Sequence, residues 1–211
     1  MIIDYDDPNK IIGDKYEAFI GCKLESDGWN VCYIGHKLGV RDHDIDLIAT
    51  QGKKIIFIQC KYHNQPLGED IIHSFRSGYD TCIDAIQRYL KRFGTKLSDI
   101  YKTPKRYLFC KNEQYSSSFL KCAKEARIEI VSTGSIPSNF DFDQEDDRFK
   151  PDYEGSESDA AALHFISKAV WKMTPVENKF DILFDSMSSI LYSLDSIKLK
   201  LRKITESEKD N

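Results

Sequence analysis

Three features are missing from this sequence of 211 residues, and each absence excludes a class of protein. No apolar run approaches the roughly 20 residues of a membrane-spanning helix. The N-terminal stretch is acidic where a secretory signal would be basic. The six cysteines form no CxxC pair and no cysteine and histidine cluster at zinc spacing, so free thiols are expected rather than disulfides or a zinc site. We therefore expect a cytoplasmic protein that does not contact membranes.

An excess of positive charge is also missing, because the formal net charge is -4 at pH 7. Proteins that coat nucleic acid by charge alone need clustered lysine and arginine residues to neutralise phosphates. No helix-turn-helix, zinc finger or other sequence-reading module is recognisable either. Any contact with nucleic acid must therefore be local, assisted by a divalent metal or shared with a partner.

The residues that are present favour a mixed α/β sheet of four or five strands flanked by helices. With 41% hydrophobic residues, the chain can bury the core of one main domain. Apolar residues three and four apart predict helices over 14–27, 67–93, 117–126 and 159–172. Residues that favour β structure predict strands over 29–35, 45–50, 54–61, 106–111 and 128–131.

The acidic segment 139–158 has few aliphatic residues and divides the chain. Its composition is typical of a linker or of an ordered surface loop. We therefore expect a main domain over 1–138 and a helical extension over 159–211. Within the extension, Thr174 and Pro175 provide an N-cap and a first helical position.

The last predicted helix carries eight apolar residues that alternate three and four positions apart, as in a heptad repeat. They are Phe180, Leu183, Met187, Ile190, Leu194, Ile197, Leu201 and Ile204. This spacing favours a helix that binds a second copy or another partner. Phe184 and Leu191 widen the apolar face, so an amphipathic helix lying on the main domain is the alternative.

A polar group is expected where two of the predicted strands meet. Asp46 lies at the start of one strand, and Gln59 and Lys61 end the next one on the same face, because residues two apart in a strand point the same way. Asp46 and Gln59 offer oxygen ligands, Cys60 offers its backbone carbonyl, and Glu17 on the first helix could complete the set. The simpler interpretation is a strand start and a solvent-facing rim. It is weakened by the apolar run before Gln59, which predicts a buried strand whose terminal lysine needs a partner.

The same segments resemble the Mrr-like restriction endonuclease family of the PD-(D/E)xK nuclease superfamily. The resemblance covers roughly residues 11–136 and rests on Gly13-Asp14-Lys15-Tyr16-Glu17, Gly28-Trp29-Asn30-Val31, Asp42-His43-Asp44-Ile45-Asp46-Leu47-Ile48 and Ile58-Gln59-Cys60-Lys61. It implies a restriction-endonuclease-like fold and a site that binds Mg²⁺ or Mn²⁺. By position it makes Asp46 the main metal ligand, Lys61 the catalytic lysine and Glu17 the helix acid. Gln59 stands where many relatives of the wider superfamily have an acidic ligand, although Mrr-like enzymes commonly carry glutamine there.

One departure from the family pattern lies just before Asp46. The family usually has a glycine before the Ile-Asp pair, whereas this chain has Asp44, and His43 replaces a small residue. Asp44 is interpreted as a surface residue or as a further ligand. His36 and His43 are candidates for a general base, although a histidine in a polar loop is more often only solvated.

Positions 88–111 form the most basic part of the chain and are the best candidates for contact with phosphates, although a solvated helix face and loop would look the same. The residues expected to bind nucleic acid are Arg88, Lys91, Arg92, Lys105 and Arg106, together with His63 after the lysine strand.

The function expected from these observations is a metal-dependent DNA endonuclease that hydrolyses phosphodiester bonds through metal-activated water. It would act as an oligomer or as the nuclease subunit of a prokaryotic or phage defence system. Two alternatives stay open because the fold is shared by several activities. One is a DNA-junction resolvase or an RNA-cleaving relative, and the other is a catalytically silent scaffold that acts through its C-terminal helix.

Overall fold

The computed structural model describes residues 7–39, 42–112, 114–143, 146–150 and 158–180, and nine further positions up to Ile197. Five strands form one sheet in the order β1-β2-β3-β4-β5. They are β1 (Asn30–Tyr33), β2 (Leu47–Gln51), β3 (Lys54–Lys61), β4 (Lys105–Cys110) and β5 (Ile128–Ser132). The first three pair antiparallel and the last three pair parallel, which confirms the mixed α/β fold.

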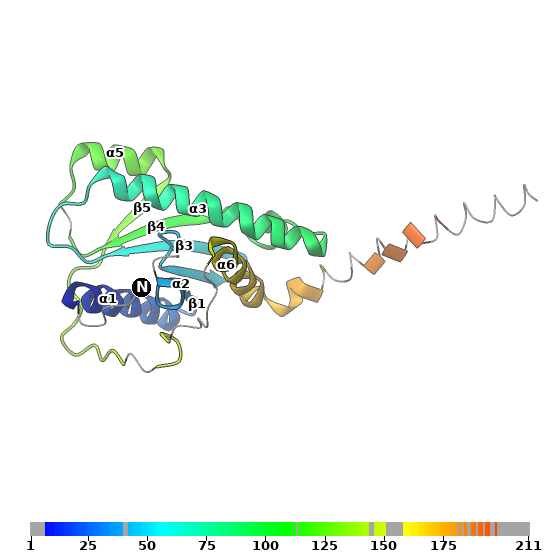
Figure 1. Cartoon of the computed structure of the whole chain (residues 1–211), viewed down its shortest axis with the longest axis horizontal. Helices are drawn as coiled ribbons and strands as arrows, with labels where there is room; N and C mark the ends of the chain where they lie inside the picture. Colours follow the sequence, from blue (N-terminus) through cyan, green and yellow to red (C-terminus); the bar gives the residue numbers. More distant parts are fainter. Residues whose placement is uncertain are drawn as a thin grey trace, which may run out of the picture.

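Helices cover both faces of this sheet (Figure 1). They are α1 (Pro8–Ser26), α2 (Ile34–Leu38), α3 (Glu69–Leu90), α4 (Leu97–Ile100), α5 (Ser117–Glu125) and α6 (Asp159–Met173). α1 lies on one face, and α3 and α5 lie on the other. α3 and α5 also provide the crossovers that parallel neighbours require. No described helix is both long and apolar enough to cross a membrane.

β3 is the central strand, and its side chains alternate between two cores. Ile55 and Phe57 pack toward α3, whereas Ile56 and Ile58 pack toward α1. Burial on both faces explains why this strand reads as a continuous apolar run. The run ends at Gln59, which is only 1% exposed, so a polar side chain is forced into the interior at the end of the strand.

The strand predicted over 29–35 is wrong at its end. β1 stops at Tyr33, its last partner in β2 is Leu47, and the chain then turns into α2. Ile34 and Leu38 lie one helical turn apart and are both buried, which favours the helix over a longer strand. The first helix also begins earlier than predicted, because Asp7 caps it by accepting a hydrogen bond from Asn9 N. The short helix α4 was not predicted.

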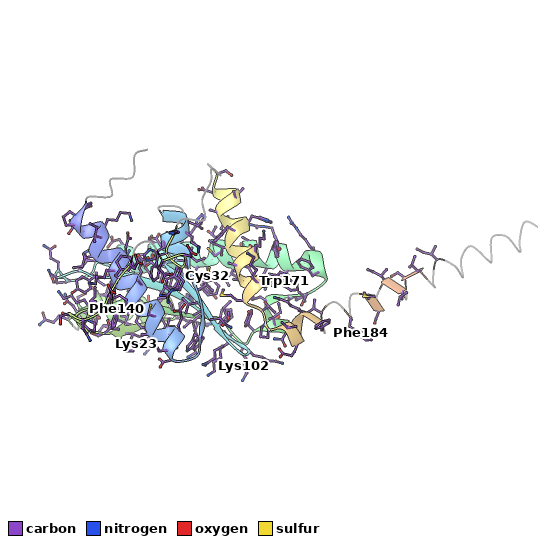
Figure 2. The ribbon with its side chains drawn as sticks, turned by 90° about the horizontal axis from the view of Figure 1, so that it is seen from below. Lys23, Cys32, Lys102, Phe140, Trp171 and Phe184 are labelled. Atoms are coloured by element: carbon purple, nitrogen blue, oxygen red, sulfur yellow. The ribbon has the colours of Figure 1, made fainter. Side chains whose placement is uncertain are left out.

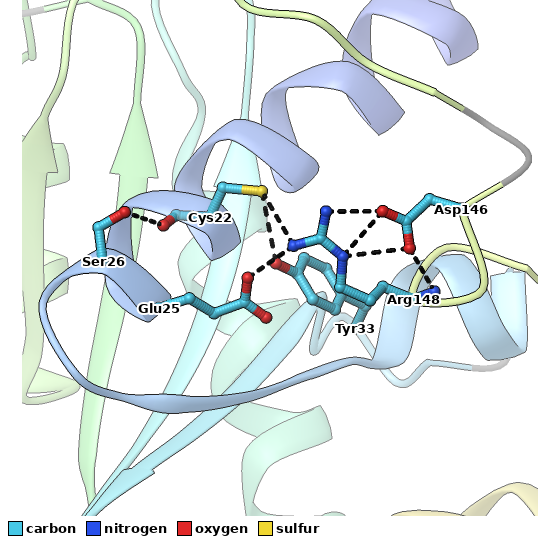
Figure 3. A network of polar contacts seen from close by, with 6 residues as sticks. All are labelled: Cys22, Glu25, Ser26, Tyr33, Asp146 and Arg148. Carbon is cyan, nitrogen blue, oxygen red and sulfur yellow. Dashed lines mark hydrogen bonds and ion pairs between the residues drawn. The ribbon is translucent and has the colours of Figure 1, made fainter.

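The described part of the acidic segment packs against the sheet domain. Phe149 is buried against Tyr33, with ring centroids 4.9 Å apart, and Phe140 contacts Phe19 on α1 at 5.4 Å. Arg148 links the segment to α1 through Glu25 at 2.8 Å and pairs with Asp146 (Figure 3). These residues therefore form an ordered surface loop, one of the two forms expected for this segment.

α6 shares the core of the sheet domain although it was expected in a separate extension. Ala162, Ile166 and Val170 are fully buried together with residues of α3. Trp171 stacks on Phe93, which follows α3, with ring centroids 4.6 Å apart and planes 2° from parallel. The boundary at residue 159 remains a prediction, but these contacts attach α6 to the face of the sheet that α3 covers.

Beyond Pro175, the described residues are helical and extend away from the sheet domain, as Phe184 shows in Figure 2. Five of the eight predicted heptad residues are described, and each is at least 52% exposed: Phe180, Met187, Ile190, Leu194 and Ile197. Leu183, Leu201 and Ile204 lie outside the described residues. Ile182, near the start of this helix, packs against the core of the sheet domain, but the five described heptad residues are left exposed.

Candidate active site

Asp46 is held in place by backbone contacts from three directions. Its N–H donates to Ile58 O at 2.9 Å, and its carbonyl accepts from Gly35 N at 2.9 Å. One side-chain oxygen, Oδ2, accepts from the backbone N–H of Cys60 at 2.5 Å. The side chain is 5% exposed. These contacts fix the carboxylate at the point where β2 begins and β3 ends.

Gln59 and Lys61 extend from β3 on the face that α3 covers, because they share the phase of Phe57 in the alternating strand. Gln59 is buried, and its Oε1 atom has no hydrogen-bond partner among the described residues. Cys60 points to the opposite core. The proposed roles of Lys61 and of the Cys60 carbonyl remain predictions, and the structure places both residues beside Asp46.

Glu17 reaches the same region from α1. Its Oε2 atom is buried, has no hydrogen-bond partner among the described residues and lies 3.8 Å from His36 Nε2. Space for this carboxylate depends on Gly35, where an added Cβ would lie 2.6 Å from Glu17 Oε2. Gly35 was not singled out from the sequence, because a glycine required for close packing looks like any other glycine.

The carboxyl groups of this region are close enough to one another and to Lys61 for these charges to affect their pKa values. Burial raises the pKa of Asp46 to about 6, although Lys61 and the Cys60 N–H act to lower it. Burial, followed by the charge of Asp46, raises the pKa of Glu17 well above its usual value, and Lys61 again opposes the shift. The positive charge of Lys61 therefore favours the ionised form of both buried carboxyl groups.

Asp42 belongs to this group but was not chosen as a site residue. Burial and then the charge of Asp46 raise its pKa to about 8, while Lys61 acts to lower it. Its Oδ1 atom accepts a hydrogen bond from Asp44 N at 2.8 Å. The acidic spacing of positions 42, 44 and 46 contained the signal, but the sequence could not show how the loop folds back.

That loop adopts an unusual backbone path. His43 and Asp44 have positive φ angles of 57° and 58°, a region that residues other than glycine rarely adopt. The loop lies directly against α3 at Gly78, where an added Cβ would collide with the His43 carbonyl oxygen. Gly78 in α3 thus leaves the space that this loop, with His43 and Asp44 in place of smaller residues, requires.

Asp44 is neither a simple surface residue nor an open ligand. Its Oδ1 atom accepts from Gln59 Nε2 at 3.2 Å, and its Oδ2 atom accepts from the Ser74 hydroxyl. The side chain is only half-buried, but both oxygens are in use. Interpreting Asp44 as a surface residue is therefore wrong.

Neither histidine near the site is simply solvated. His36 Nε2 lies 3.1 Å from Asp14 O, and burial lowers the pKa of its ring. The Nε2 atom of His43 is buried without a hydrogen-bond partner in the described part of the chain. A role for either residue as a general base stays a prediction.

The residues expected to bind nucleic acid do not gather around Asp46. Lys105 and Arg106 pair in register with Ile56 and Phe57, which places them about 10 Å and about 7 Å along the strand direction from Gln59. The other three lie in the last turn of α3 or directly after it: Arg88, Lys91 and Arg92. Contact of these five residues with nucleic acid therefore stays a prediction and would require a long substrate.

His63 is the exception, because it follows β3 at the end where the site lies. Its carbonyl accepts a hydrogen bond from Asn112 Nδ2 at 2.8 Å. The neighbouring Lys111 donates to Asn64 Oδ1 at 2.6 Å and lies 4.6 Å from the ring centroid of Tyr62. Lys111 was included in the basic stretch but was not chosen for the site, since only strand register shows that it lies beside Lys61.

Comparison with known proteins bears on this arrangement. A search of the curated proteins found no match. Among solved structures, a match is the crystal structure of a protein of unknown function, AF1548, with 17% sequence identity and a TM-score of 0.32. The match covers 56% of each chain, so this protein spans little more than half the length of that structure.

The family model of the Mrr catalytic domain, described as restriction endonuclease, matches residues 9–87. This range contains Glu17, Asp42, Asp46, Gln59 and Lys61, together with α1 and the first three strands of the sheet. The family expected from the sequence is confirmed for this range, and the five-stranded sheet of the described chain has the expected mixed α/β architecture. Residues 9–87 are therefore similar to the restriction endonuclease family that the sequence suggested.

Proposed function

We propose that this protein is a metal-dependent DNA endonuclease whose site consists of Asp46, Gln59, Glu17 and Lys61. The observation that carries the proposal is a pair of buried side-chain oxygens, Glu17 Oε2 and Gln59 Oε1, without hydrogen-bond partners among the described residues. Buried polar atoms are nearly always paired, so unpaired ones call for an explanation. Their position in the region of the Asp46 carboxylate supports a bound cation as that explanation.

The donor set fits a hard divalent cation. Carboxylate and amide oxygens are the ligands that Mg²⁺ and Mn²⁺ prefer, and the Cys60 carbonyl could add one more. The pKa values of Asp46 and Glu17 are raised because negative charge is buried near other negative charge. A bound cation would neutralise this charge and remove the cause of the shift. A bound cation would supply a Lewis acid that activates water and neutralises phosphate oxygens.

The residues of the chain then have separate tasks. Asp46 and Glu17 hold negative charge that binds the cation, and Gln59 adds a neutral oxygen that limits the repulsion. Lys61 lies at the end of β3 beside Asp46 and can place its ammonium group against a phosphate oxygen, where it stabilises the charge that develops in the transition state.

Cleavage assays with the purified full chain test this proposal. Plasmid DNA, linear DNA, a branched DNA junction and RNA are each incubated with Mg²⁺, Mn²⁺ or a chelator. We expect cutting of DNA with metal only, and a loss of about 100-fold or more in Lys61→Ala. Lys54→Ala is the matched control, because Lys54 is an exposed lysine at the other end of β3.

The same assays separate the alternatives. Preferential cutting of the junction or of RNA would replace the DNA endonuclease with a resolvase or an RNA-cleaving enzyme. No cutting of any substrate by the folded protein would favour a silent scaffold. The intact set of Glu17, Asp46, Gln59 and Lys61 favours an active enzyme.

We also propose that the protein works as an assembly in a prokaryotic or phage defence system. The exposed heptad residues after Pro175 would pack against the same helix of a second copy. Two copies of this helix carry the same heptad spacing, so their apolar side chains can interdigitate along the whole contact. The restriction endonuclease description of the matching family model supports a defence role. Phage plating on cells that express the wild type or Lys61→Ala tests it, and equal plating would contradict it.

A further inference from the structure

The identity of residue 59 creates a problem that a glutamate would not have. Both oxygens of a glutamate can bind a cation, whereas the glutamine amide has one oxygen and one NH₂ group of similar shape. If the amide rotates by half a turn, the NH₂ group faces the cation and the ligand is lost. A chain with glutamine at this position therefore needs a contact that fixes the orientation of the amide.

Asp44 provides such a contact. Its Oδ1 atom lies 3.2 Å from Gln59 Nε2, and a carboxylate oxygen can only accept a hydrogen bond, so the NH₂ group must face Asp44. The amide oxygen then points the other way, where it is buried and has no partner among the described residues. The orientation follows from the chemistry of the partner.

Asp44 is itself fixed on both sides. The Ser74 hydroxyl on α3 donates to its second oxygen, and the backbone N–H of Asp44 donates to Asp42 Oδ1 at 2.8 Å. The positive φ of 58° turns the side chain inward from the loop. Gly78, about one turn of α3 beyond Ser74, allows the loop to rest on the helix.

We propose that Asp44 is a positioning residue that holds the Gln59 amide oxygen toward the metal site, with Ser74 as its support. This assignment rests on the proposed function. It assigns a role to the acidic residue that stands where the family usually has glycine. It also links that residue to Gln59 through the hydrogen bond between Gln59 Nε2 and Asp44 Oδ1.

Binding of Mn²⁺ to four full-length proteins tests the assignment: wild type, Asp44→Asn, Gln59→Glu and the double variant. Asparagine tolerates a positive φ, but it can present an NH₂ group to Gln59 and release the amide. We expect Asp44→Asn to weaken Mn²⁺ binding about 10-fold, as the loss of a partner that orients a ligand commonly does.

In the Gln59→Glu background we expect Asp44→Asn to have the opposite effect on Mn²⁺ binding. The introduced glutamate would face the Asp44 carboxylate, so Asp44→Asn would remove a repulsion and strengthen Mn²⁺ binding. A purely structural role for Asp44 would give the same sign in both backgrounds. Asp84→Asn, which changes an exposed aspartate on the same helix as Ser74, is the control and should alter Mn²⁺ binding in neither background.

The outcomes are distinguishable. Equal Mn²⁺ binding by wild type and Asp44→Asn, or a change of the same sign in both backgrounds, would overturn the positioning role and leave the proposed function intact. No Mn²⁺ binding and no cleavage by the wild type would overturn the proposed function, and the positioning role with it.

A second, independent observation concerns the outer side of α3. Glu69 and His73 are one helical turn apart, and Cys122 on α5 faces them. Their ligand atoms all lie within 4.8 Å of one another, and His73 Nε2 is 3.7 Å from Cys122 Sγ. A tetrahedral zinc ion with a nitrogen and a sulfur ligand would separate these two atoms by about 3.6 Å.

We infer that Glu69, His73 and Cys122 form a zinc site that joins α3 to α5 and is separate from the nuclease site. A thiolate, an imidazole and a carboxylate suit Zn²⁺, whereas Mg²⁺ prefers oxygen ligands alone. Glu69 and His73 are exposed, which leaves the fourth position to water. The sequence did not reveal this set because its members are spread over 69–122.

Absorption of the Co²⁺-loaded full chain in excess Mg²⁺ tests the zinc site. Bonding between a thiolate and Co²⁺ gives a charge-transfer band that oxygen ligands cannot produce, so the nuclease site does not contribute. We expect one such site per chain that Zn²⁺ displaces. The band should disappear in Cys122→Ser, and binding should weaken at least about 10-fold in His73→Ala.

Cys22→Ser is the matched control, since Cys22 is another half-buried cysteine, and it should keep the band. Absence of the band in the wild type would overturn the zinc site. So would a band that persists in Cys122→Ser or is unchanged in His73→Ala. The result does not depend on nuclease activity.

Discussion

At the end of β3, the oxygens of Glu17 and Gln59 are buried without hydrogen-bond partners among the described residues, whereas on the helix after Pro175 large apolar side chains face the solvent. Phe184, for example, is 72% exposed. The first region buries polar oxygens, and the second exposes apolar side chains. Both arrangements are unfavourable in isolation. The comparison supports both proposals, in which a cation completes the first region and an apolar surface completes the second.

The two regions differ in how firmly they are held. Asp46 is anchored by hydrogen bonds to Ile58, Gly35 and Cys60, so its position does not depend on a ligand. Contacts to the sheet domain are found mainly at the start of the described helix after Pro175. There, Lys179 lies 5.6 Å from the ring centroid of Trp171. A preorganised site suits chemistry, and an uncovered helix suits association.

The largest effect is expected from crowding the buried region. Gly35→Ala would push a methyl group against Glu17 Oε2, and displacement of a catalytic group by about 1 Å can lower activity about 100-fold. Cleavage assays and Mn²⁺ titration measure the loss. Gly13→Ala is the control, because no atom lies within 4 Å of an added Cβ there. Unchanged activity in Gly35→Ala would remove Glu17 from the site.

The exposed region should instead control assembly. Ile190→Asp places a charge in the proposed heptad seam and should reduce the mass measured by light scattering at least about twofold, since a buried seam does not tolerate an unpaired charge. Ser188→Asp, on an exposed non-heptad position of the same helix, should leave the mass unchanged. Removal of residues 175–211 should have the same effect as Ile190→Asp. Equal masses per chain for all four proteins would show that this helix does not assemble copies of the chain.

A smaller effect is expected from pH in the absence of metal. A carboxyl group with a higher pKa in the folded than in the unfolded protein binds more protons when folded, so the free energy of unfolding falls as pH rises between the two values. For Asp46 and Asp42, with pKa values raised to about 6 and about 8, this interval runs from about pH 4 to pH 8.

The Tm in chelator should therefore fall by several degrees from pH 5 to pH 8, since 1 kcal/mol moves the Tm of a domain of this size by about 2–4 °C. Calorimetry with and without Mg²⁺ measures it. Mg²⁺ should reverse the fall, and Asp42→Asn should flatten it. A Tm that rises over this range in chelator would contradict the raised pKa values.

Most of the fold could be predicted because its periodicity is strong. β3 reads as a continuous apolar run because both of its faces are buried, and α3 shows an apolar stripe because one side packs on the sheet. The errors fall where tertiary contacts override local pattern. Residues 34–35 look like strand, yet burial of Ile34 and Leu38 turns them into a helix. Likewise, the acidic composition of 139–158 hides the three phenylalanines that anchor it.

The main residues of the site could be predicted from the sequence, but the residues that hold them in position could not. Asp46, Gln59 and Lys61 lie close together in sequence and in adjacent strands, so spacing alone brings them near each other. Gly35, Asp44 and Ser74 act through contacts that depend on the path of one loop. No local pattern encodes such a path, because the positive φ angles at His43 and Asp44 arise only when the loop lies on α3.

The close contact at Gly78 has a mechanical consequence. α3 contains 22 residues and is therefore a stiff rod about 33 Å long. It supports the loop that carries Asp44 at one point and packs against α6, which leads into the exposed helix, at another. A tilt of this rod imposed by assembly would shift the loop, so the association of chains and the readiness of the nuclease site would be adjusted together.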